Sequence, residues 1–284
     1  MNENFIINDH LQIKYLTDSL RIIGLTPAGG TNIMADTGGF PPVPTPYGDF
    51  HFRGGHRLWH APESMPRTYI PDSAVTITEL PNGVRLEAQT EPGTGIRKQI
   101  EIQLAPDKPS ATLIHTLFND GLWAVELAPW TITQLRPGGT AILPISSGGV
   151  DPAGLLPNRQ FSLWPYARIN DSRLRLGDEF ILFKTDALPQ RFKMGYFNSS
   201  GWMAYWLDGI LFRKTFDVHT GLRYPDNNCN AELYCNAHFL ELETLAPLAM
   251  LLPGMSVTHK ETWDVSNGLD ALPVDIRKTL EQNI

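Results

Sequence analysis

Short runs in which hydrophobic and polar residues alternate make up most of this chain. Ile100, Ile102 and Leu104 alternate with polar residues, so a strand here would have one apolar and one polar face. Similar runs on either side of a turn signal at 81–83 predict a β-hairpin. The same alternation predicts further strands over 111–118, 124–135, 174–183, 202–212, 238–243 and 255–265.

Helical periodicity is clear only near the C-terminal end, where Leu272, Ile276 and Leu280 repeat every four residues behind Pro273. Many short strands separated by turn residues indicate an antiparallel sandwich or barrel. Glycine and proline, 24 and 23 residues, are distributed along the whole chain and mark no linker. We therefore predict a single all-β domain over residues 1–284, with a short helix at about 273–284.

The bulk composition narrows the class of protein. With 284 residues, 42% of them hydrophobic, the chain can bury a full core without disulfides or metal ions. Its net charge of −7 argues against a nucleic-acid-binding protein, which needs a basic face to bind phosphates. No stretch has the length of apolar sequence that spans a bilayer, and the first residues do not resemble a signal peptide. We expect a cytoplasmic protein with no membrane partner, and its two cysteines, Cys229 and Cys235, fit a reducing compartment.

The segment 49–63 is unusually rich in chemically versatile side chains. It contains three histidines, two arginines, adjacent glycines and a tryptophan, with a carboxylate at each end. Such groups bind polar small molecules, and burying them without a partner costs folding energy. We interpret the segment as one wall of a binding site, with a histidine-rich surface loop as the alternative.

The histidines of this segment could also bind a metal ion. His51, His56, His60 and Glu63 are suitable ligands, but the odd spacing of His51 and His56 puts these two on opposite faces of a straight strand. A bulge at the glycine pair could still bring them together, so a metal site stays an alternative, although we expect no metal and no cofactor. The chain has neither a nucleophile elbow nor a phosphate-binding loop, which argues against nucleotide transfer and the common serine hydrolases.

Later strands contribute further polar residues. His115 lies on the apolar face of its strand, where a hydrogen-bonded core histidine is the alternative to a functional one. Glu241 and Glu243 share one strand face, and two carboxylates this close are seldom both in a dry core. We expect them to face solvent or a polar cavity. The loop 224–228 could present Asp226 to the same site.

Three segments together resemble one protein superfamily. The run His115–Asn119 resembles the epimerase motif Asn-His-Thr-Tyr-Phe-Asn-Leu, with Ile114 in place of the first asparagine and Leu117 in place of the tyrosine. The run 54–59 is similar to a glycine-rich sugar-binding region, and the run 240–244 is similar to the closing strands that carry a catalytic glutamate. This combination resembles the galactose mutarotase-like superfamily, which includes aldose 1-epimerases and hexose-6-phosphate epimerases. Within it, the chain is most similar to a branch with the motif Gly-Gly-His-Arg-Leu-Trp.

The resemblance implies a β-supersandwich with a sugar on the concave face of one sheet. It also implies mutarotation, in which a glutamate base removes the anomeric hydroxyl proton and a histidine acid protonates the ring oxygen, without metal or cofactor. The proton-transfer residues would then be His115 and either Glu241 or Glu243. The sugar-binding residues would be His56, Arg57, Trp59, Glu63 and Asp226.

The sequence leaves three functions open. The first is a sugar epimerase of the aldose 1-epimerase kind. The second is a non-catalytic carbohydrate-binding or sensing protein on the same fold, because side chains that hold hydroxyl groups do so whether or not protons move. The third is a metal-dependent enzyme built on the histidines of 51–63. In the first two cases the partner is a small sugar or sugar derivative.

Overall fold

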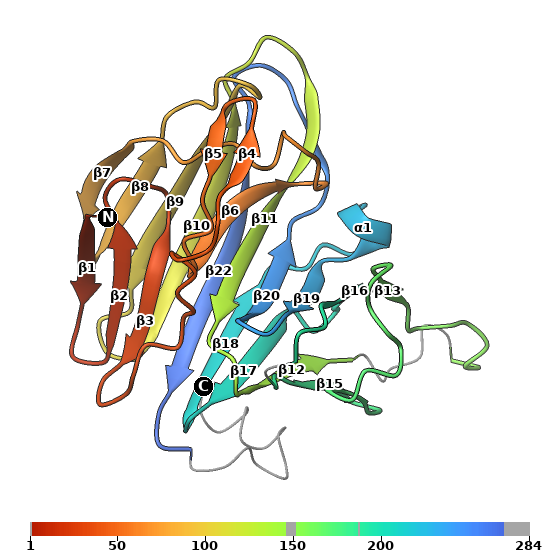
Figure 1. Cartoon of the computed structure of the whole chain (residues 1–284). Coiled ribbons are helices and arrows are strands. Elements are labelled where there is room, and N and C mark those ends of the chain that lie inside the picture. Colours follow the sequence, from red (N-terminus) through yellow and green to blue (C-terminus); the bar gives the residue numbers. More distant parts are fainter. Residues whose placement is uncertain (1, 146–151, 187, 270–284) are drawn as a thin grey trace.

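The computed structural model describes residues 2–145, 152–186 and 188–269. Within these residues the chain forms two large antiparallel β-sheets that pack face to face, and a small hairpin covers part of one of them (Figure 1). The predicted all-β sandwich is confirmed. The helix predicted at about 273–284 lies outside the described residues.

Each large sheet has ten strands in the described part of the chain. In spatial order, sheet I contains β1 (Glu3–Ile7), β2 (Leu11–Leu16), β3 (Ile22–Pro27), β6 (His56–Ala61), β11 (Val125–Leu135), β20 (Leu240–Leu245), β19 (Ala231–Cys235), β16 (Phe192–Tyr196) and β13 (Phe161–Leu163), with β21 (Ala249–Leu251) paired to β11. Sheet II contains β14 (Leu174–Leu176), β15 (Phe180–Lys184), β12 (Thr140–Pro144), β17 (Trp202–Leu207), β18 (Ile210–Phe216), β22 (Ser256–Ser266), β10 (Ser110–Asn119), β9 (Ile96–Leu104), β8 (Gly83–Ala88) and β7 (Val75–Leu80). The hairpin is β4 (Val43–Thr45) with β5 (Gly48–Phe50), and the short helix is α1 (Pro225–Asn228).

Most predicted strands are present close to their predicted positions. The hairpin over 75–88 forms as expected from its turn signal. Two runs that were predicted as single strands, 174–183 and 202–212, are each two strands joined by a tight turn. In the second turn, Asp208 and Gly209 have φ angles of 50° and 81°, the conformation that Asp-Gly favours in a two-residue hairpin.

The main core lies between the sheets, where alternate residues of facing strands meet. A second apolar cluster lies on the opposite, outer face of sheet I. There the ring of Phe50, from the hairpin, lies 5.7 Å from that of Trp59, which in turn lies 5.4 Å from that of Trp130. The central strands of sheet I are therefore covered on both faces, which explains why all six residues of β6 are buried.

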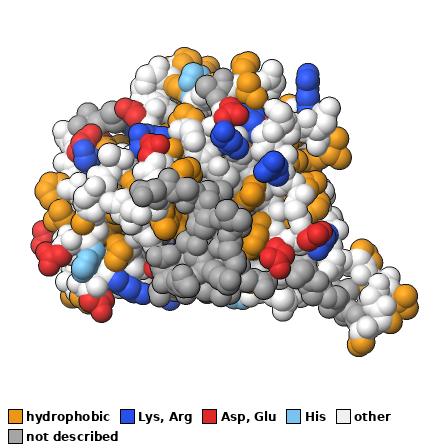
Figure 2. All heavy atoms as spheres, turned by 90° about the horizontal axis from the view of Figure 1, so that it is seen from below, with side chains coloured by type: hydrophobic (Ala, Val, Ile, Leu, Met, Phe, Trp, Pro, Cys, Tyr) orange, Lys and Arg blue, Asp and Glu red, His pale blue; other side chains and the backbone are white. Residues whose placement is uncertain are grey.

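The surface carries charges of both signs. In the view from below, lysine and arginine side chains lie among aspartate, glutamate and hydrophobic side chains (Figure 2). Such mixing agrees with the modest net charge of −7. None of the helices in the described part of the chain has the length and apolar composition that a membrane span requires.

Two adjacent glycines determine how β6 begins. Gly54 and Gly55 have φ angles of 74° and 62°. A Cβ atom on Gly54 would lie 2.1 Å from the carbonyl oxygen of Ala35, and one on Gly55 would lie 1.9 Å from that of Ile22. Glycine is required here because both the backbone conformation and the neighbouring chains exclude a side chain. The pair thereby directs the side chains that follow along β6.

Replacing Gly55 by alanine should destabilise the protein strongly. The new Cβ would overlap the backbone of β3, and the positive φ adds strain. We expect the free energy of unfolding, measured by urea denaturation, to fall by about 3 kcal/mol or more. Gly39→Ala is the control, because a Cβ at that position would meet no atom within 4 Å. Equal losses in the two variants would contradict the role given to Gly55.

Candidate functional site

A cavity of about 410 Å³ lies over the outer face of sheet I. Its volume suits a small molecule. The strands β6, β11, β20, β19 and β16, which are neighbours in sheet I, provide its floor, and connecting segments provide its walls. The lining residues are Phe40, Phe52, Arg57, Trp59, Glu63, Tyr69, Trp130, Ile132, Trp164, Tyr166, Arg191, Lys193, Tyr234, Asn236, Phe239 and Glu241.

An ion pair between strands forms one part of the floor. Arg57 on β6 donates from Nη2 to Glu241 Oε1 on β20 at 3.0 Å, and Gln134 on β11 donates from Nε2 to the same oxygen at 2.8 Å. The guanidinium carbon of Arg57 also lies 4.3 Å from the ring centroid of Trp59, a cation–π contact that orients it. Three strands thus hold one carboxylate in a fixed position.

Glu241 is the more accessible of the two glutamates on β20. Its exposed fraction is 7%, whereas Glu243 is fully buried. Burial raises the pKa of Glu241, and the positive charge of Arg57 acts in the opposite direction. The Glu241 carboxyl group therefore lies at the cavity with a proton affinity above that of a free glutamate.

A second charged group lies beside the first. Lys193 Nζ is 2.8 Å from Glu232 Oε2 and 2.9 Å from Glu243 Oε2. The same nitrogen lies 4.7 Å and 4.6 Å from the ring centroids of Trp130 and Trp164. Burial raises the pKa of Glu232 well above its ordinary value, although the charge of Lys193 opposes that shift. Lys193 lines the cavity, and the two carboxylates that hold it do not.

Aromatic rings line both the floor and the walls. The rings of Trp59 and Tyr69 are 4.9 Å apart, and those of Tyr166 and Tyr234 are 6.5 Å apart. The Tyr69 hydroxyl donates a hydrogen bond to Glu63, which also lines the cavity. The cavity therefore combines flat apolar surfaces with charged and hydrogen-bonding groups.

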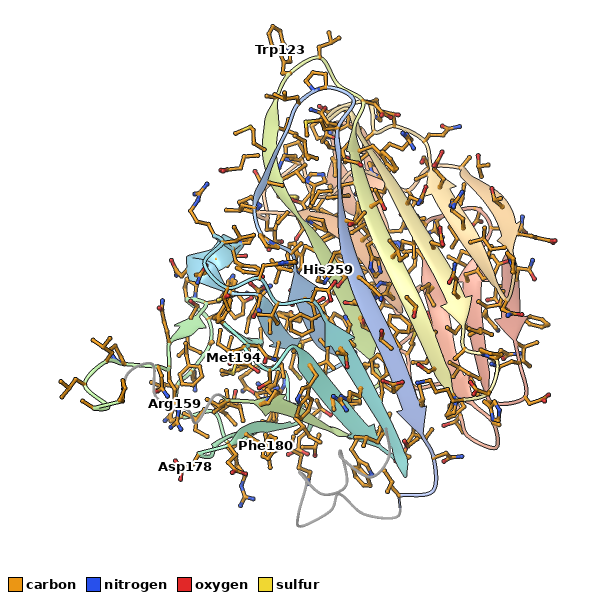
Figure 3. All side chains as sticks on the ribbon, turned by 180° about the vertical axis from the view of Figure 1, so that it is seen from behind. Trp123, Arg159, Asp178, Phe180, Met194 and His259 are labelled. Atoms are coloured by element: carbon orange, nitrogen blue, oxygen red, sulfur yellow. The ribbon has the colours of Figure 1, made fainter. Side chains whose placement is uncertain are left out.

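His115, which we expected to act as the catalytic acid, lies outside this cavity. Its side chain is fully buried in the layer between the sheets, and it belongs to β10 of sheet II, so that sheet I separates it from the cavity. Its neighbour His259, labelled in Figure 3, is also buried, and its Nε2 lies 2.7 Å from the Thr244 hydroxyl oxygen. The alternative, a hydrogen-bonded core histidine, is the one that this geometry supports. His56 points into the same layer, and its predicted contact with a sugar is corrected for the same reason.

The core histidines form a directed chain of hydrogen bonds. Burial lowers the pKa of His115 to about 4 and that of His56 well below its ordinary value, so both rings are neutral at pH 7. His115 Nδ1 must donate to the carbonyl oxygen of His259, 3.1 Å away, so its Nε2 accepts from His56 Nε2 at 2.8 Å. His56 Nδ1 then accepts from the Thr133 hydroxyl at 2.8 Å, and Thr133 accepts from Lys214 at 3.0 Å.

Three groups in this layer are close enough to hold a metal ion. The ligand atoms of His56, His115 and Glu261 all lie within 4.8 Å of one another. However, the chain of hydrogen bonds uses all four imidazole nitrogens, and Glu261 accepts from Lys214 at 2.9 Å and from Trp263 at 2.8 Å. A lysine ammonium beside the carboxylate would also repel a cation. These residues fit a hydrogen-bonded core better than a metal centre.

Comparison with known proteins identifies the fold. No protein-family model and no curated protein sequence matches this chain, but solved structures do. A galactose mutarotase-like protein from Lactobacillus casei has a TM-score of 0.60 at 11% identity, covering 93% of this chain and 100% of that chain. The chain has the galactose mutarotase-like fold. A galactose mutarotase related enzyme from Lactobacillus acidophilus has a TM-score of 0.59 at 8% identity over 96% and 100% of the two chains. A candidate aldose 1-epimerase from Escherichia coli has a TM-score of 0.58 at 12% identity over 94% and 100%.

The galactose mutarotase-like fold brings several predicted site residues to one place. Arg57, Trp59, Glu63 and Glu241 all line the cavity, and Glu243 lies just below it under Lys193. Asp226 does not line the cavity: it lies in α1, where it has a φ of 51°.

The predicted metal ligands of 51–63 are not brought together. His51 is exposed, His56 and His60 are buried on the inner face of sheet I, and Glu63 lines the cavity on its outer face. Among the described residues, the group whose ligand atoms lie close enough to hold an ion is His56 with His115 and Glu261, which contains only one of these four residues. The alternative of a metal enzyme built on this segment is therefore incorrect.

Sequence reasoning missed half of the floor. The predicted strand at 124–135 places Trp130, Ile132 and Gln134 on one face, and this alternation could have suggested a mixed apolar and polar surface. Lys193 gave no such signal, because its strand is short and otherwise reads as an ordinary buried strand. The tryptophan that covers it, Trp164, follows a three-residue strand.

Stability should fall as the pH decreases from 6.5 toward 4.5. Burial lowers the pKa of His115 to about 4 and that of His259 to about 3, and also lowers that of His56, so the unfolded chain takes up protons that the folded protein does not. We expect unfolding in this range to take up roughly two to three protons from these side chains. The measurement is the free energy of unfolding from urea denaturation at several pH values.

A variant isolates the histidine contribution. The raised pKa values of Glu232 and Glu241 act in the opposite direction, because these groups favour the folded state as the pH decreases. In His115→Asn, proton uptake on unfolding should therefore decrease by roughly one proton relative to the unaltered protein. Identical pH dependence in both proteins would contradict the neutral core histidine.

Proposed function

We propose that this protein binds a sugar in the cavity over sheet I. The observation that supports this most directly is the pairing of aromatic faces with a polar floor, in which Trp59 and Trp130, paired across β6 and β11, lie on one side of the ion pair of Arg57 and Glu241. A pyranose ring has the same two kinds of surface, apolar C–H faces and a rim of hydroxyl groups. Its faces can pack on the rings while its hydroxyl groups bond to the floor.

Unused hydrogen-bonding groups in the floor support the same proposal. Among the described residues, Arg57 Nε and Gln134 Oε1 are buried without a hydrogen-bond partner. One is a donor and the other an acceptor, and a buried polar group without a partner costs about 1–3 kcal/mol. Arg57 lines the cavity, so a sugar hydroxyl group could accept from its Nε, whereas Gln134 lies beneath the lining and bonds to Glu241.

A second candidate function, mutarotation, is favoured by the position and raised pKa of Glu241. This carboxylate could remove the proton from the anomeric hydroxyl as the ring C–O bond breaks. The lining described here contains no histidine to serve as acid. Lys193 could stabilise the ring oxygen until it takes a proton from water. However, Glu232 and Glu243 raise the pKa of Lys193 despite its burial, which makes it a weak proton donor. We therefore rank binding first.

Removal of an aromatic wall should weaken sugar binding. In Trp59→Ala we expect the dissociation constant for the best-binding hexose in a panel to increase about tenfold or more, because a stacking surface is lost. Saturation-transfer NMR and calorimetry would measure it. Trp123→Ala is the matched control, because Trp123 is 79% exposed on a loop at one end of the molecule (Figure 3). A panel in which no sugar binds would refute the proposal.

Replacing Glu241 by glutamine separates binding from turnover. Glutamine keeps the size and one acceptor of the side chain but cannot take a proton, so binding should change by only about threefold while any acceleration of mutarotation falls about a hundredfold or more. Optical rotation of freshly dissolved α-aldoses measures turnover. If the unaltered protein binds a sugar without accelerating its mutarotation, the second candidate is wrong and the first remains.

A further inference from the structure

A second cavity, of about 330 Å³, lies on the other side of β6. Trp59 faces the first cavity, and His60, the next residue, faces the second. The second cavity lies between β6 and β11 of sheet I and β9 of sheet II. Ile96, Val125 and Leu127 form its apolar wall. It is therefore separate from the proposed sugar site.

His60 brings an unused acceptor to this second cavity. Its side chain is buried, and its Nε2 lies 3.4 Å from Glu91 Oε2. Burial lowers the pKa of His60, so the ring is neutral. Although burial opposes its charge, Lys98 and His60 together lower the pKa of Glu91 to about 2, so this carboxylate is ionised. Neither ring nitrogen has a hydrogen-bond partner among the described residues. Because the ionised Glu91 carboxylate lies next to Nε2, the neutral ring places its N–H on that side and keeps the lone pair on Nδ1.

Arg67 brings an unused donor. It donates from Nη2 to the carbonyl oxygen of Pro62, but its Nε is buried without a partner among the described residues. None of the ion pairs within the described chain involves Arg67, whereas Glu126, which also lines the cavity, pairs with Arg223. The cavity thus offers one cation without a counter-ion, one imidazole acceptor and an apolar wall.

The β4–β5 hairpin closes another side of the second cavity. Tyr47, in the turn between β4 and β5, lies against Gly93, where a Cβ would come within 2.3 Å of the tyrosine ring. A side chain at Gly93 would push this ring away. The close fit shows that the hairpin shapes this cavity as well as covering sheet I.

We propose that the second cavity binds a small apolar molecule that carries a carboxylate next to a hydroxyl group, the chemistry of an aromatic or branched hydroxy acid. The carboxylate accepts from Arg67, the hydroxyl group donates to His60 Nδ1, and the apolar part packs on Ile96, Val125 and Leu127. Such a ligand satisfies both unused groups and the charge of Arg67 at once. The proposal is independent of what the first cavity binds.

Three probes test the proposal on the unaltered protein. Mandelate has the phenyl ring, hydroxyl and carboxylate, phenylacetate lacks the hydroxyl, and benzyl alcohol lacks the carboxylate. We expect mandelate to shift the NMR signals of the His60 ring and the Thr94 amide saturably, and each of the other two to bind at least about fivefold more weakly. Equal affinity for all three, no saturable shift, or shifts confined to residues of the first cavity would overturn the proposal.

A variant adds a second test. Arg67→Met keeps the length and apolar stem of the side chain but removes the charge, and it should weaken mandelate binding about tenfold while sugar binding in the first cavity is unchanged. Arg85→Met is the matched control, because Arg85 pairs with Glu101 away from both cavities. Thermal unfolding confirms that each variant is folded. Unchanged mandelate affinity in Arg67→Met would refute the role of Arg67 and with it the proposal.

Discussion

Burial of paired charged side chains, on the outer face of sheet I and between the two sheets, is the constraint on which this structure depends. On the outer face of sheet I, Arg57 pairs with Glu241, and between the sheets Lys214 pairs with Glu261. An isolated buried charge costs far more than a folded domain can tolerate, so each must have a partner. Removing one partner of such a pair typically costs about 3–5 kcal/mol. In each pair the partners lie on different strands of one sheet, β6 and β20 in sheet I and β18 and β22 in sheet II, so each pair forms only when its sheet is assembled.

Strand alternation gives adjacent residues opposite roles. His56 points between the sheets and Arg57 points to the outer cavity, and on β11 Thr133 and Gln134 divide in the same way. The bond from Thr133 to His56 ties β11 to β6 directly beneath the ion pair of Arg57 and Glu241, which Gln134 supports. Hydrogen bonds between the sheets thus hold the side chains of the outer cavity in place before any ligand binds. This reduces the conformational entropy that is lost on binding.

The sequence was informative where local pattern determines structure. Alternation predicted the strands, and the glycine pair before His56 marked the segment that brings Arg57 and Trp59 to the cavity. It failed where function depends on which sheet a strand joins. His115 lies on an apolar strand face, and only the placement of β10 in sheet II shows that this face is sealed. The sequence did not predict that Lys193 and Trp164 line the cavity, because their contacts join segments that are far apart in the sequence.

The position of His115 bears directly on what this galactose mutarotase-like fold can do. Both nitrogens of this ring are used inside the core, and the described cavity lining contains carboxylates and cations but no histidine. A general acid must reach the reacting atom, so the His115 imidazole cannot protonate a sugar in the cavity. Glu241 could act as the base, but no imidazole in the described lining could act as the acid. The groups that remain, aromatic faces and a fixed donor–acceptor floor, are those that the proposed binding of a sugar requires, and such binding does not depend on opening of the sugar ring.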